Sequence, residues 1–439
     1  MTRSELAALL GAPNGVVADP RNGPVMVSEP DPKKFMTAFA SAVARGGDVF
    51  LGDPNWRETE KAQLAALIDP QVSSFRSQVS QPASGWLMIP TGGTSGALKF
   101  ARHDEETLSA AVRGFTRHFG LRQVNAMGVL PLHHVSGLMA WLRCALTGGE
   151  FRPLDWKAVE GGELPALPPK PDGWTLSLVP TQLERLLRQG VERVAPNALA
   201  REKKRVEGNA FHPNAVEWLR QFRVIFIGGA PAWPALLELA ARHQLPISLG
   251  YGMTETAAMV TALRPAEFLA GVRSNGPVLP HATVRIDDGE RIVIGGQSLF
   301  RGYYPEWRGA GDFATQDRGS LDAQGHLHVL GRLDAVIITG GEKVDPAELE
   351  ALLRGTGQFP DIVVLGVPDP RWGQQVVAVY PGSAQPNLHQ VIVATNRLAD
   401  YKRPKRFMPL VGPWPANAQG KVNRAELLAR VIAQLQERR

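Results

Sequence analysis

The chain has one cysteine, no long apolar run and no dense cluster of basic residues, and each shortage excludes a class of protein. Cys144 is the only cysteine among 439 residues, which excludes an internal disulfide framework and suits a reducing cytoplasm. No apolar run reaches the roughly 20 residues that a membrane-spanning helix needs. Residues 1–14 lack the apolar core and cleavage site of a secretory signal. We therefore expect a cytoplasmic protein without a transmembrane segment.

The chain is basic, but its charges are scattered. It has 48 lysines and arginines against 42 aspartates and glutamates, a net charge of +6. The only tight basic run, 201–205, includes a glutamate and lacks the interleaved aromatic residues of single-strand nucleic-acid binders. We interpret it as a solvated loop and expect no nucleic-acid partner. A mildly basic surface also suits an enzyme with polyanionic substrates, because it raises their local concentration.

The length and the pattern of apolar runs predict an α/β protein of more than one domain. Between about 86 and 260, apolar strand-like runs alternate with amphipathic segments, which is typical of layered α/β domains with largely parallel strands. We expect strands at 86–91, 126–132, 174–179, 224–228 and 246–251, and helices at 104–119, 136–147, 181–189 and 232–243. Cys144 falls in an apolar helical pattern, so we expect it in the core rather than as a nucleophile.

The pattern of predicted elements changes beyond about residue 275. Two short apolar runs, 282–286 and 291–294, flank Asp287-Asp288-Gly289-Glu290, which predicts a hairpin. Short strands are expected at 326–330 and 336–339. The remaining segments predict helix 345–354, strand 361–367, strand 374–380, helix 386–399 and helix 423–437. We place the domain boundary near 332–334, which gives an N-terminal domain of 1–332 and a C-terminal domain of 333–439.

A glycine-rich segment is the most informative part of the sequence. After the apolar run 86–89 the chain reads Thr91-Gly92-Gly93-Thr94-Ser95-Gly96-Ala97-Leu98-Lys99. Glycines let backbone N–H groups curl closely around an anion, hydroxyls add donors and Lys99 adds a mobile positive charge. It is not a Walker A loop, because Lys99 lies three residues after Gly96. The segment predicts a polyphosphate site, with a plain turn between two strands as the alternative.

Four further segments carry side chains suited to a nucleotide. Gly228-Gly229-Ala230-Pro231 ends an apolar strand and leaves room for a flat ring. Tyr251-Gly252-Met253-Thr254-Glu255 offers an aromatic face for a base, a hydroxyl for phosphate and a carboxylate for Mg²⁺. Asp317 and Arg332 are an acceptor and a donor suited to ribose hydroxyls. Lys421 follows a flexible run near the C-terminus. Singly, each segment has a plain structural alternative, such as a strand-ending turn or a surface ion pair between Arg332 and Asp334.

In this order, the five segments resemble the adenylate-forming superfamily of acyl-CoA synthetases, luciferases and peptide-synthetase adenylation domains. The resemblance extends from about residue 80 to the C-terminus. Gly92 and Leu98 replace a serine and a proline of the family's phosphate loop, and Gln316 stands where the family usually has glycine. The resemblance implies a large N-terminal domain of layered α/β sheets with a small β-barrel-like part. It also implies a smaller, mobile α+β C-terminal domain.

The resemblance assigns roles to the nucleotide-binding segments. It implies that Tyr251 stacks on adenine, that Thr254 meets phosphate, that Glu255 holds Mg²⁺ and that Asp317 binds the ribose. The expected ATP- or AMP-binding set is Thr91, Gly92, Gly93, Thr94, Ser95, Gly96, Lys99, Gly228, Gly229, Ala230, Pro231, Tyr251, Gly252, Met253, Asp317 and Arg332.

Further roles fall in the C-terminal part. The run 331–344 is similar to the family's hinge loop, with Asp334 at the hinge and Gly340 and Gly341 lining the channel for CoA. Segments 372–374 and 401–405 match the C-terminal domain of acyl-CoA synthetases. Lys421 matches the catalytic lysine.

Two adjacent histidines lie in a segment, 131–137, that resembles the family's substrate-side motif. There His134 borders the acyl pocket and can gate it, and a structural His133-His134 pair is the alternative. We do not expect zinc, because adjacent histidines do not readily share one tetrahedral site and no cysteine lies nearby.

The resemblance implies an AMP-forming acid–thiol ligase that uses ATP, Mg²⁺ and CoA, the last as a co-substrate. Segments 177–183 and 313–319 are most similar to 2-succinylbenzoate–CoA ligases of the menaquinone and phylloquinone pathways. Arg185 and Arg143 are candidates for the second carboxylate of that substrate, although plain surface arginines are the favoured interpretation. The alternatives are another acyl- or aryl-CoA ligase and a nucleotide-binding homologue without catalysis. The sequence leaves the oligomeric state, including a homodimer, open.

Overall fold

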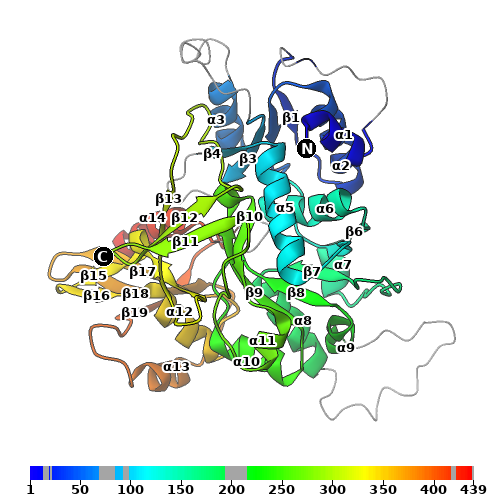
Figure 1. The fold of residues 1–439 in the computed structure, drawn as a ribbon. Coiled ribbons are helices and arrows are strands. Elements are labelled where there is room, and N and C mark those ends of the chain that lie inside the picture. The colour runs from blue at the N-terminus through cyan, green and yellow to red at the C-terminus, as the bar shows by residue number, and fades with distance from the viewer. Residues whose placement is uncertain are drawn as a thin grey trace.

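The computed structural model describes residues 1–12, 19, 22–68, 85–91, 98–192, 215–416 and 422–437. These residues form four sheets with helices packed around them (Figure 1). Neither the basic run 201–205 nor the expected site residues Gly92, Gly93, Thr94, Ser95, Gly96 and Lys421 lie within the described ranges. Among the described residues, no helix is long and apolar enough to cross a membrane.

The first sheet packs against the N-terminal helices. Its strand order is β1-β2-β3-β4, with β1, β2 and β3 parallel and β4 antiparallel to β3. The strands are β1 (Val25–Val27), β2 (Val49–Leu51), β3 (Leu87–Thr91) and β4 (Lys99–His103). The helices are α1 (Arg3–Leu9), α2 (Pro32–Arg45) and α3 (Glu58–Ile68). The glycine-rich segment of the sequence connects β3 to β4.

The second sheet is the parallel core that the alternating pattern predicts. Its order is β10-β9-β8-β7-β5-β6, and only β9 and β10 pair antiparallel. The strands are β5 (Ala126–Gly128), β6 (Phe151–Pro153), β7 (Thr175–Leu178), β8 (Val224–Ile227), β9 (Ile247–Met253) and β10 (Ala258–Ala262). The helices are α5 (Glu105–Phe119), α6 (Val135–Thr147), α7 (Trp156–Glu160), α8 (Pro180–Glu192), α9 (Ala215–Arg220), α10 (Pro234–Arg242) and α11 (Pro265–Leu269). The expected strand 126–132 ends early, because the chain turns toward α6 after Gly128.

Local signals set the bounds of α5, the helix that crosses the front of the molecule in Figure 1. Asp104 caps its start by accepting a hydrogen bond from the Thr107 N–H at 2.9 Å. Gly120 ends it in the left-handed conformation, with φ of 63°. The buried Asp104 carboxylate also accepts a hydrogen bond from Arg301 at 2.6 Å. This ion pair ties the start of α5 to the loop that carries Tyr303.

The small β part is a four-stranded antiparallel sheet of consecutive strands. It consists of β11 (Ala282–Ile286), β12 (Arg291–Gly296), β13 (Phe313–Leu321) and β14 (Leu327–Arg332). The expected hairpin at Asp287–Glu290 connects β11 to β12. Apolar residues of β12 and β14 share one cluster with Tyr251 and Met253, so this sheet packs directly against the end of β9.

The C-terminal part has its own sheet, in the order β16-β15-β18-β17 with β19 beside β18. Its elements are β15 (Ile337–Thr339), β16 (Glu342–Val344), α12 (Pro346–Gly355), β17 (Val363–Asp369), β18 (Gly373–Pro381), α13 (Leu388–Thr395), β19 (Arg406–Leu410) and α14 (Arg424–Gln436). The expected helix 386–399 is shorter, and β19 was not expected from the sequence. That strand is short, contains Pro409 and pairs with a strand some 25–30 residues earlier.

The apolar clusters change at the connection between β14 and β15. Two clusters contain only residues from Ile337 onward, and the buried members of the other clusters all come from earlier residues. One contact between the parts is made by α12, where Arg354 lies 5.8 Å from the Trp233 ring of the N-terminal part and Ala351 packs against its core. This division supports a domain boundary near 332–334, which stays a prediction.

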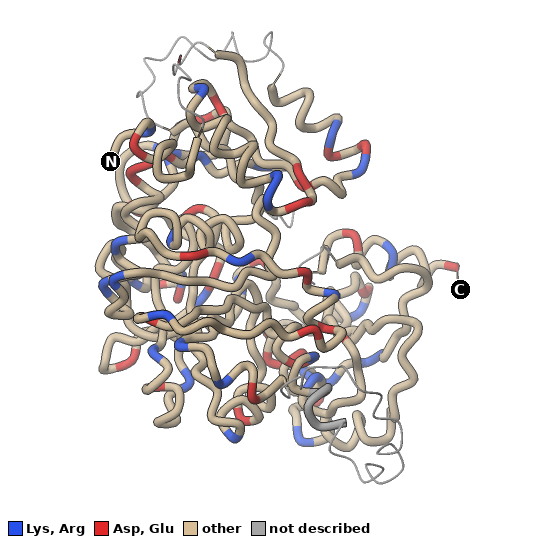
Figure 2. The backbone as a smooth tube through the Cα atoms, turned by 90° about the vertical axis from the view of Figure 1, so that its right-hand side faces the viewer, with Lys and Arg blue, Asp and Glu red and all other residues tan. Residues whose placement is uncertain are grey.

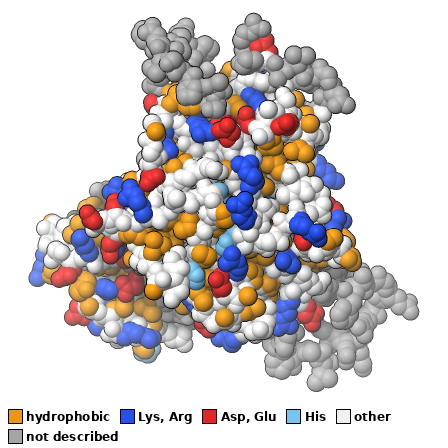
Figure 3. Space-filling view, viewed as in Figure 1, with side chains coloured by type: hydrophobic (Ala, Val, Ile, Leu, Met, Phe, Trp, Pro, Cys, Tyr) orange, Lys and Arg blue, Asp and Glu red, His pale blue; other side chains and the backbone are white. Residues whose placement is uncertain are grey.

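Charge is distributed as the sequence indicates. Basic and acidic positions alternate along the chain without a long block of one sign (Figure 2). On the face shown in Figure 3, basic side chains are interspersed with acidic and apolar ones, apart from a short basic column in the middle.

Cys144 provides a test of the core. It is 1% exposed in α6, and burial raises the pKa of its thiol to about 12. We predict that a maleimide labels the native protein at pH 7.5 on the order of 10³ times more slowly than the unfolded chain, because the thiolate is the reactive species. Mass spectrometry measures the labelling, and Cys144→Ala is the unlabelled control. Rapid labelling of native protein would contradict this packing.

Candidate active site

The candidate site lies at the carboxyl ends of the parallel strands, where ligands bind in open α/β sheets. The strand register aligns Leu178 of β7 with Ile227 of β8 and Leu249 of β9. The segment 228–231 leaves β8 at this edge, and residues 229–231 are exposed, so a flat ring has room beside them. Gly252 is required at the end of β9, since a Cβ there would lie 2.0 Å from the Ala258 carbonyl oxygen.

Tyr251, Asp317 and Arg332 come together as their expected roles require. The Tyr251 hydroxyl donates a hydrogen bond to Asp317 Oδ2 at 2.7 Å. Arg332 Nη1 lies 3.4 Å from the other oxygen of Asp317. Burial, and then the Asp317 carboxylate, raise the pKa of Tyr251 far above its usual value, so the hydroxyl stays a donor. The base-side and ribose-side residues of the prediction therefore form one connected group.

The same arginine reaches the expected hinge. Arg332 makes two hydrogen bonds to Asp334, from Nε at 2.7 Å and from Nη2 at 2.6 Å. Such a bidentate pair is directional as well as favourable. Arg332 thus contacts one carboxylate on β13 and a second within the connection between β14 and β15.

Glu255 is held in a buried position by Tyr303. The Tyr303 hydroxyl donates to Glu255 Oε1 at 2.6 Å, and Glu255 is 9% exposed. Lys99, at the start of β4, places its Nζ 5.6 Å from the centre of the Tyr303 ring. Tyr303 therefore connects the expected metal-binding carboxylate to the expected phosphate-binding lysine.

A strained turn presents Glu255 and Thr254 from the end of β9. Ala257 and Ala258, which follow in the chain, adopt φ of 50° and 87°. Residues with a side chain rarely adopt such angles, which cost on the order of 1–3 kcal/mol each. The Thr254 carbonyl accepts a hydrogen bond at 2.7 Å from Nε2 of His103, a buried imidazole whose pKa burial lowers to about 4. Neutral His103 thus fixes the backbone beside Glu255.

The sequence alone did not identify Tyr303 and His103. Tyr303 is placed by pairing between β4 and the loop after β12, with a bridge between Ala101 and Tyr303. Neither residue belongs to a glycine-rich segment or a recognisable spacing. Only the glycine and proline around Tyr303, in Arg301-Gly302-Tyr303-Tyr304-Pro305, indicated an ordered turn.

His133 and His134 are close to each other and to an aspartate. Their ring centres are 4.4 Å apart, and His133 Nε2 lies 3.6 Å from Asp53 Oδ2. One ligand atom from each of Asp53, His133 and His134 lies within 4.8 Å of the others. The expectation that adjacent histidines do not readily share one tetrahedral site stays a prediction, which this grouping of atoms brings into question. Burial alone would raise the pKa of Asp53, but His133 and the Asn55 N–H lower it to about 2.

The expected CoA-channel glycines lie in the β15–β16 turn. Gly340 and Gly341 have φ of 59° and 87°, and Gly340 donates a hydrogen bond to the Trp372 carbonyl at 2.8 Å. Trp372 is 45% exposed beside this turn. No hydrogen bond recorded among the described residues joins the turn to Tyr251 or Glu255, so the structure places it with the C-terminal part.

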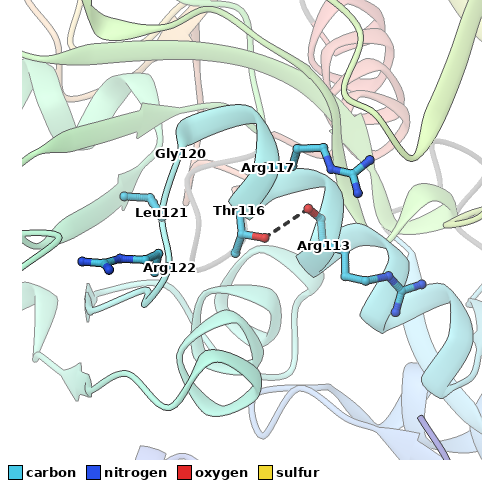
Figure 4. A pocket seen from close by; sticks show the side chains of 6 residues that line it. All are labelled: Arg113, Thr116, Arg117, Gly120, Leu121 and Arg122. Carbon is cyan, nitrogen blue, oxygen red and sulfur yellow. Dashed lines mark hydrogen bonds between the residues drawn. The ribbon is translucent and has the colours of Figure 1, made fainter.

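A hollow on the surface lies apart from these residues. Arg113, Arg117 and Arg122 line it at the end of α5, together with Thr116, Gly120 and Leu121 (Figure 4). None of the expected site residues lines it. The chemistry of the site therefore depends on the strand ends rather than on this hollow.

Comparison with known proteins identifies the family. A model of the family described as AMP-binding enzyme matches residues 25–304, well over half of the chain. The chain belongs to the AMP-binding enzyme family. A 2-succinylbenzoate–CoA ligase of Listeria monocytogenes is 30% identical over 356 residues, which are 77% of this chain and 69% of that protein. An indoleacetate–CoA ligase of Aromatoleum aromaticum is 28% identical over 388 residues, 84% of this chain and 70% of that protein.

Solved structures show the same fold. The o-succinylbenzoate CoA synthetase of Bacillus subtilis with its acyl-adenylate intermediate has a TM-score of 0.73 at 22% identity, covering 97% of this chain and 91% of that chain. The same enzyme with ATP and magnesium has a TM-score of 0.72 at 22% identity, covering 97% and 92%. The expected adenylate-forming fold is confirmed for this AMP-binding family member.

The Tyr251–Asp317–Arg332 group leads to a prediction for nucleotide binding. We predict that Asp317→Asn weakens AMP binding about tenfold or more, because a hydrogen bond to a charged group contributes about 1.5–3 kcal/mol. Calorimetric titration measures the dissociation constant. Asp288→Asn, in the exposed β11–β12 hairpin, is the matched control. Equal affinity in all three proteins would exclude Asp317 from the ribose site.

Proposed function

We propose that this protein is an ATP-dependent acid–CoA ligase. Its reaction joins a carboxylate and ATP to give acyl-AMP and pyrophosphate, and the CoA thiol then gives acyl-CoA and AMP. The observation that carries the proposal is the convergence of Tyr251, Asp317, Glu255 and Lys99 at one edge of a family-typical fold. That convergence supports a nucleoside bound at Tyr251 and Asp317, with its phosphates near Lys99 and Glu255.

The two half-reactions follow from the weak reactivity of a carboxylate. Its leaving group would be oxide, so it cannot be attacked by a thiol directly. Attack of the carboxylate oxygen on the α-phosphorus forms the mixed anhydride and expels pyrophosphate. The thiolate of CoA then attacks the acyl carbon, and AMP leaves with the electron pair of the broken C–O bond.

The residues present fit a magnesium ion at Glu255. Mg²⁺ prefers one or two carboxylates together with waters and substrate phosphates. Tyr303 binds Oε1 of this carboxylate, and Glu255 would hold the ion. An ion held there would neutralise negative charge on the phosphates. Lys99 adds a second positive charge beside the Tyr303 ring.

Lys421 and the C-terminal domain complete the proposal. The lysine, known here from the sequence only, contributes positive charge between the carboxylate and the α-phosphate during adenylation. We propose that rotation at Asp334 then withdraws Lys421 and brings the Gly340–Gly341 turn to the site for thioester formation. The bidentate contact between Arg332 and Asp334 lies at the connection that must turn.

We propose 2-succinylbenzoate as the acid, which places the reaction in menaquinone or phylloquinone synthesis. The Listeria relative and the Bacillus structure, both named for that substrate, support this choice. The substrate keeps a second carboxylate, which needs a cation or several N–H donors. Arg143 is 4% exposed and packs 4.0 Å over the Phe115 ring, so it does not reach an open pocket. Arg185, exposed on α8 and paired with Glu160 at 3.1 Å, is the better candidate.

We propose indoleacetate as the second candidate acid, because one relative is an indoleacetate–CoA ligase. A monocarboxylate needs no second cation, so the two acids differ in their dependence on Arg185. The cytoplasm is the proposed location, which the single buried cysteine supports. The proposed partners are small molecules, and a homodimer is left to measurement.

The role proposed for Lys421 leads to a prediction for the two half-reactions. We predict that Lys421→Ala slows carboxylate-dependent ATP–pyrophosphate exchange by a factor on the order of 10²–10³, because one preorganised charge is lost. The same variant should still convert synthetic acyl-adenylate and CoA to thioester. Lys61→Ala, on the exposed face of α3, is the control. Equal loss of both half-reactions in a folded variant would contradict the two-conformation proposal, and ADP as the product would contradict the ligase itself.

The choice of 2-succinylbenzoate as the acid substrate leads to a prediction for Arg185. With a panel of carboxylic acids and CoA, we predict the highest kcat/KM for 2-succinylbenzoate, measured as thioester formed. Arg185→Ala should raise the KM for this diacid about tenfold or more while changing indoleacetate little, since only the diacid offers a charge-assisted contact. Arg220→Ala is the control, because Arg220 lies on α9, another helix beside the second sheet. An equal effect on both acids would mean that Arg185 does not bind the second carboxylate of 2-succinylbenzoate. The absence of thioester with every acid would favour a non-catalytic homologue.

A further inference from the structure

Three side chains with metal-binding atoms meet beside the first and second sheets. Asp53 follows β2, and His133 and His134 lie in the turn between β5 and α6. One atom from each residue lies within 4.8 Å of the other two. Among the described residues, this is the one group of three or more such side chains with that geometry.

The backbone fixes this meeting point. Parallel pairing of β2 with β3 aligns Val49 with Leu87 and Phe50 with Met88, so Asp53 leaves β2 at the same edge of the sheet where β3 ends. Gly137 allows the first turn of α6 to lie against the preceding turn, because a Cβ there would be 2.2 Å from the Pro131 carbonyl oxygen. The tight turn carries both histidines at its corner.

The spacing suits ligands around a shared ion better than a direct hydrogen bond. His133 Nε2 and Asp53 Oδ2 are 3.6 Å apart, beyond the roughly 2.7–3.2 Å of an N–H···O hydrogen bond. Two ligands at about 2.0–2.1 Å from a tetrahedral zinc ion lie about 3.3–3.4 Å from each other. His133 is 6% exposed, and its Nε2 makes no hydrogen bond within the described part of the chain. A buried nitrogen in this state is costly unless something binds it.

We propose that Asp53, His133 and His134 form a binding site for a divalent transition-metal ion of the zinc type. Two imidazoles and one carboxylate are a usual ligand set for Zn²⁺, Co²⁺ or Fe²⁺, with one or more positions open. The set differs in chemistry from the single carboxylate Glu255, whose oxygen suits Mg²⁺. The two sites therefore select different ions.

The proposed metal site lies next to the candidate active site, and His134 is the residue that the two sites share. Leu132 and Val135, on either side of the histidine pair, pack in one apolar cluster with Ala257, two residues after Glu255. An ion bound here would fix the ring of His134, the residue expected to border the acyl pocket. Binding itself does not depend on the proposed ligase activity, because it is measured on the protein alone.

The test is titration of the full-length, chelator-treated protein with Co²⁺, followed by its visible absorption bands. We expect one Co²⁺ per chain, displaced by one Zn²⁺. Asp53→Asn and His133→Gln should each weaken Zn²⁺ binding at least tenfold, since loss of even an outer-shell partner costs about 10–100-fold. Zinc should also raise the thermal unfolding midpoint of the unaltered protein but not of the variants, because a ligand stabilises the state that binds it.

A second group of the same residue types provides the matched control. Asp322 lies 3.1 Å from His328 on β14 and 3.8 Å from His326 just before it, but these three do not form such a group of convergent atoms. His328→Gln should leave Co²⁺ and Zn²⁺ binding unchanged. The proposal fails if no stoichiometric ion binds, or if His328→Gln abolishes binding while Asp53→Asn and His133→Gln retain it. Circular dichroism of each variant verifies that it is folded, and two independent ligand variants guard against a single folding defect.

Discussion

The end of β9 lies where two sheets pack together, and the hydrogen bond from Tyr251 to Asp317 joins them. Tyr251 belongs to the parallel sheet, whereas Asp317 belongs to the antiparallel one. Apolar residues on both sides form one cluster around Tyr251 and Met253. Because this junction is packed, the residues that follow Met253 emerge at a fixed position, with Thr254 and Glu255 at the common edge.

Neutral donors hold the two carboxylates of the site in place. Tyr303 donates to Glu255 as Tyr251 donates to Asp317, and burial raises the pKa of both tyrosines far above its usual value. A tyrosine fixes a carboxylate without cancelling its charge. Asp317 has an arginine as its second partner, because Arg332 Nη1 lies 3.4 Å from Asp317 Oδ1.

Arg332 connects the nucleotide-binding end of the molecule to the C-terminal part. Nη1 of Arg332 contacts Asp317 on β13, and Nε and Nη2 contact Asp334 within the β14–β15 connection. The carboxylate proposed for the ribose and the carboxylate proposed for the hinge therefore share one guanidinium through different nitrogens.

The sequence by itself determined part of the secondary structure and the contiguous motifs. The alternating pattern predicted β3, β7, β8, β9 and the helices α5, α6, α8 and α10, because a buried face imposes its period on neighbouring residues. It did not predict β13 or β19. The motifs at Gly228–Pro231, Tyr251–Glu255 and Gly340–Gly341 were found because each is contiguous in the chain. Tertiary structure alone decided the partners of these motifs: Tyr303 with Glu255, His103 with Thr254, and Asp53 with the two histidines. Those pairs are distant in sequence, and they meet only because strand register and the packing of one sheet on another bring separate loops to the same edge.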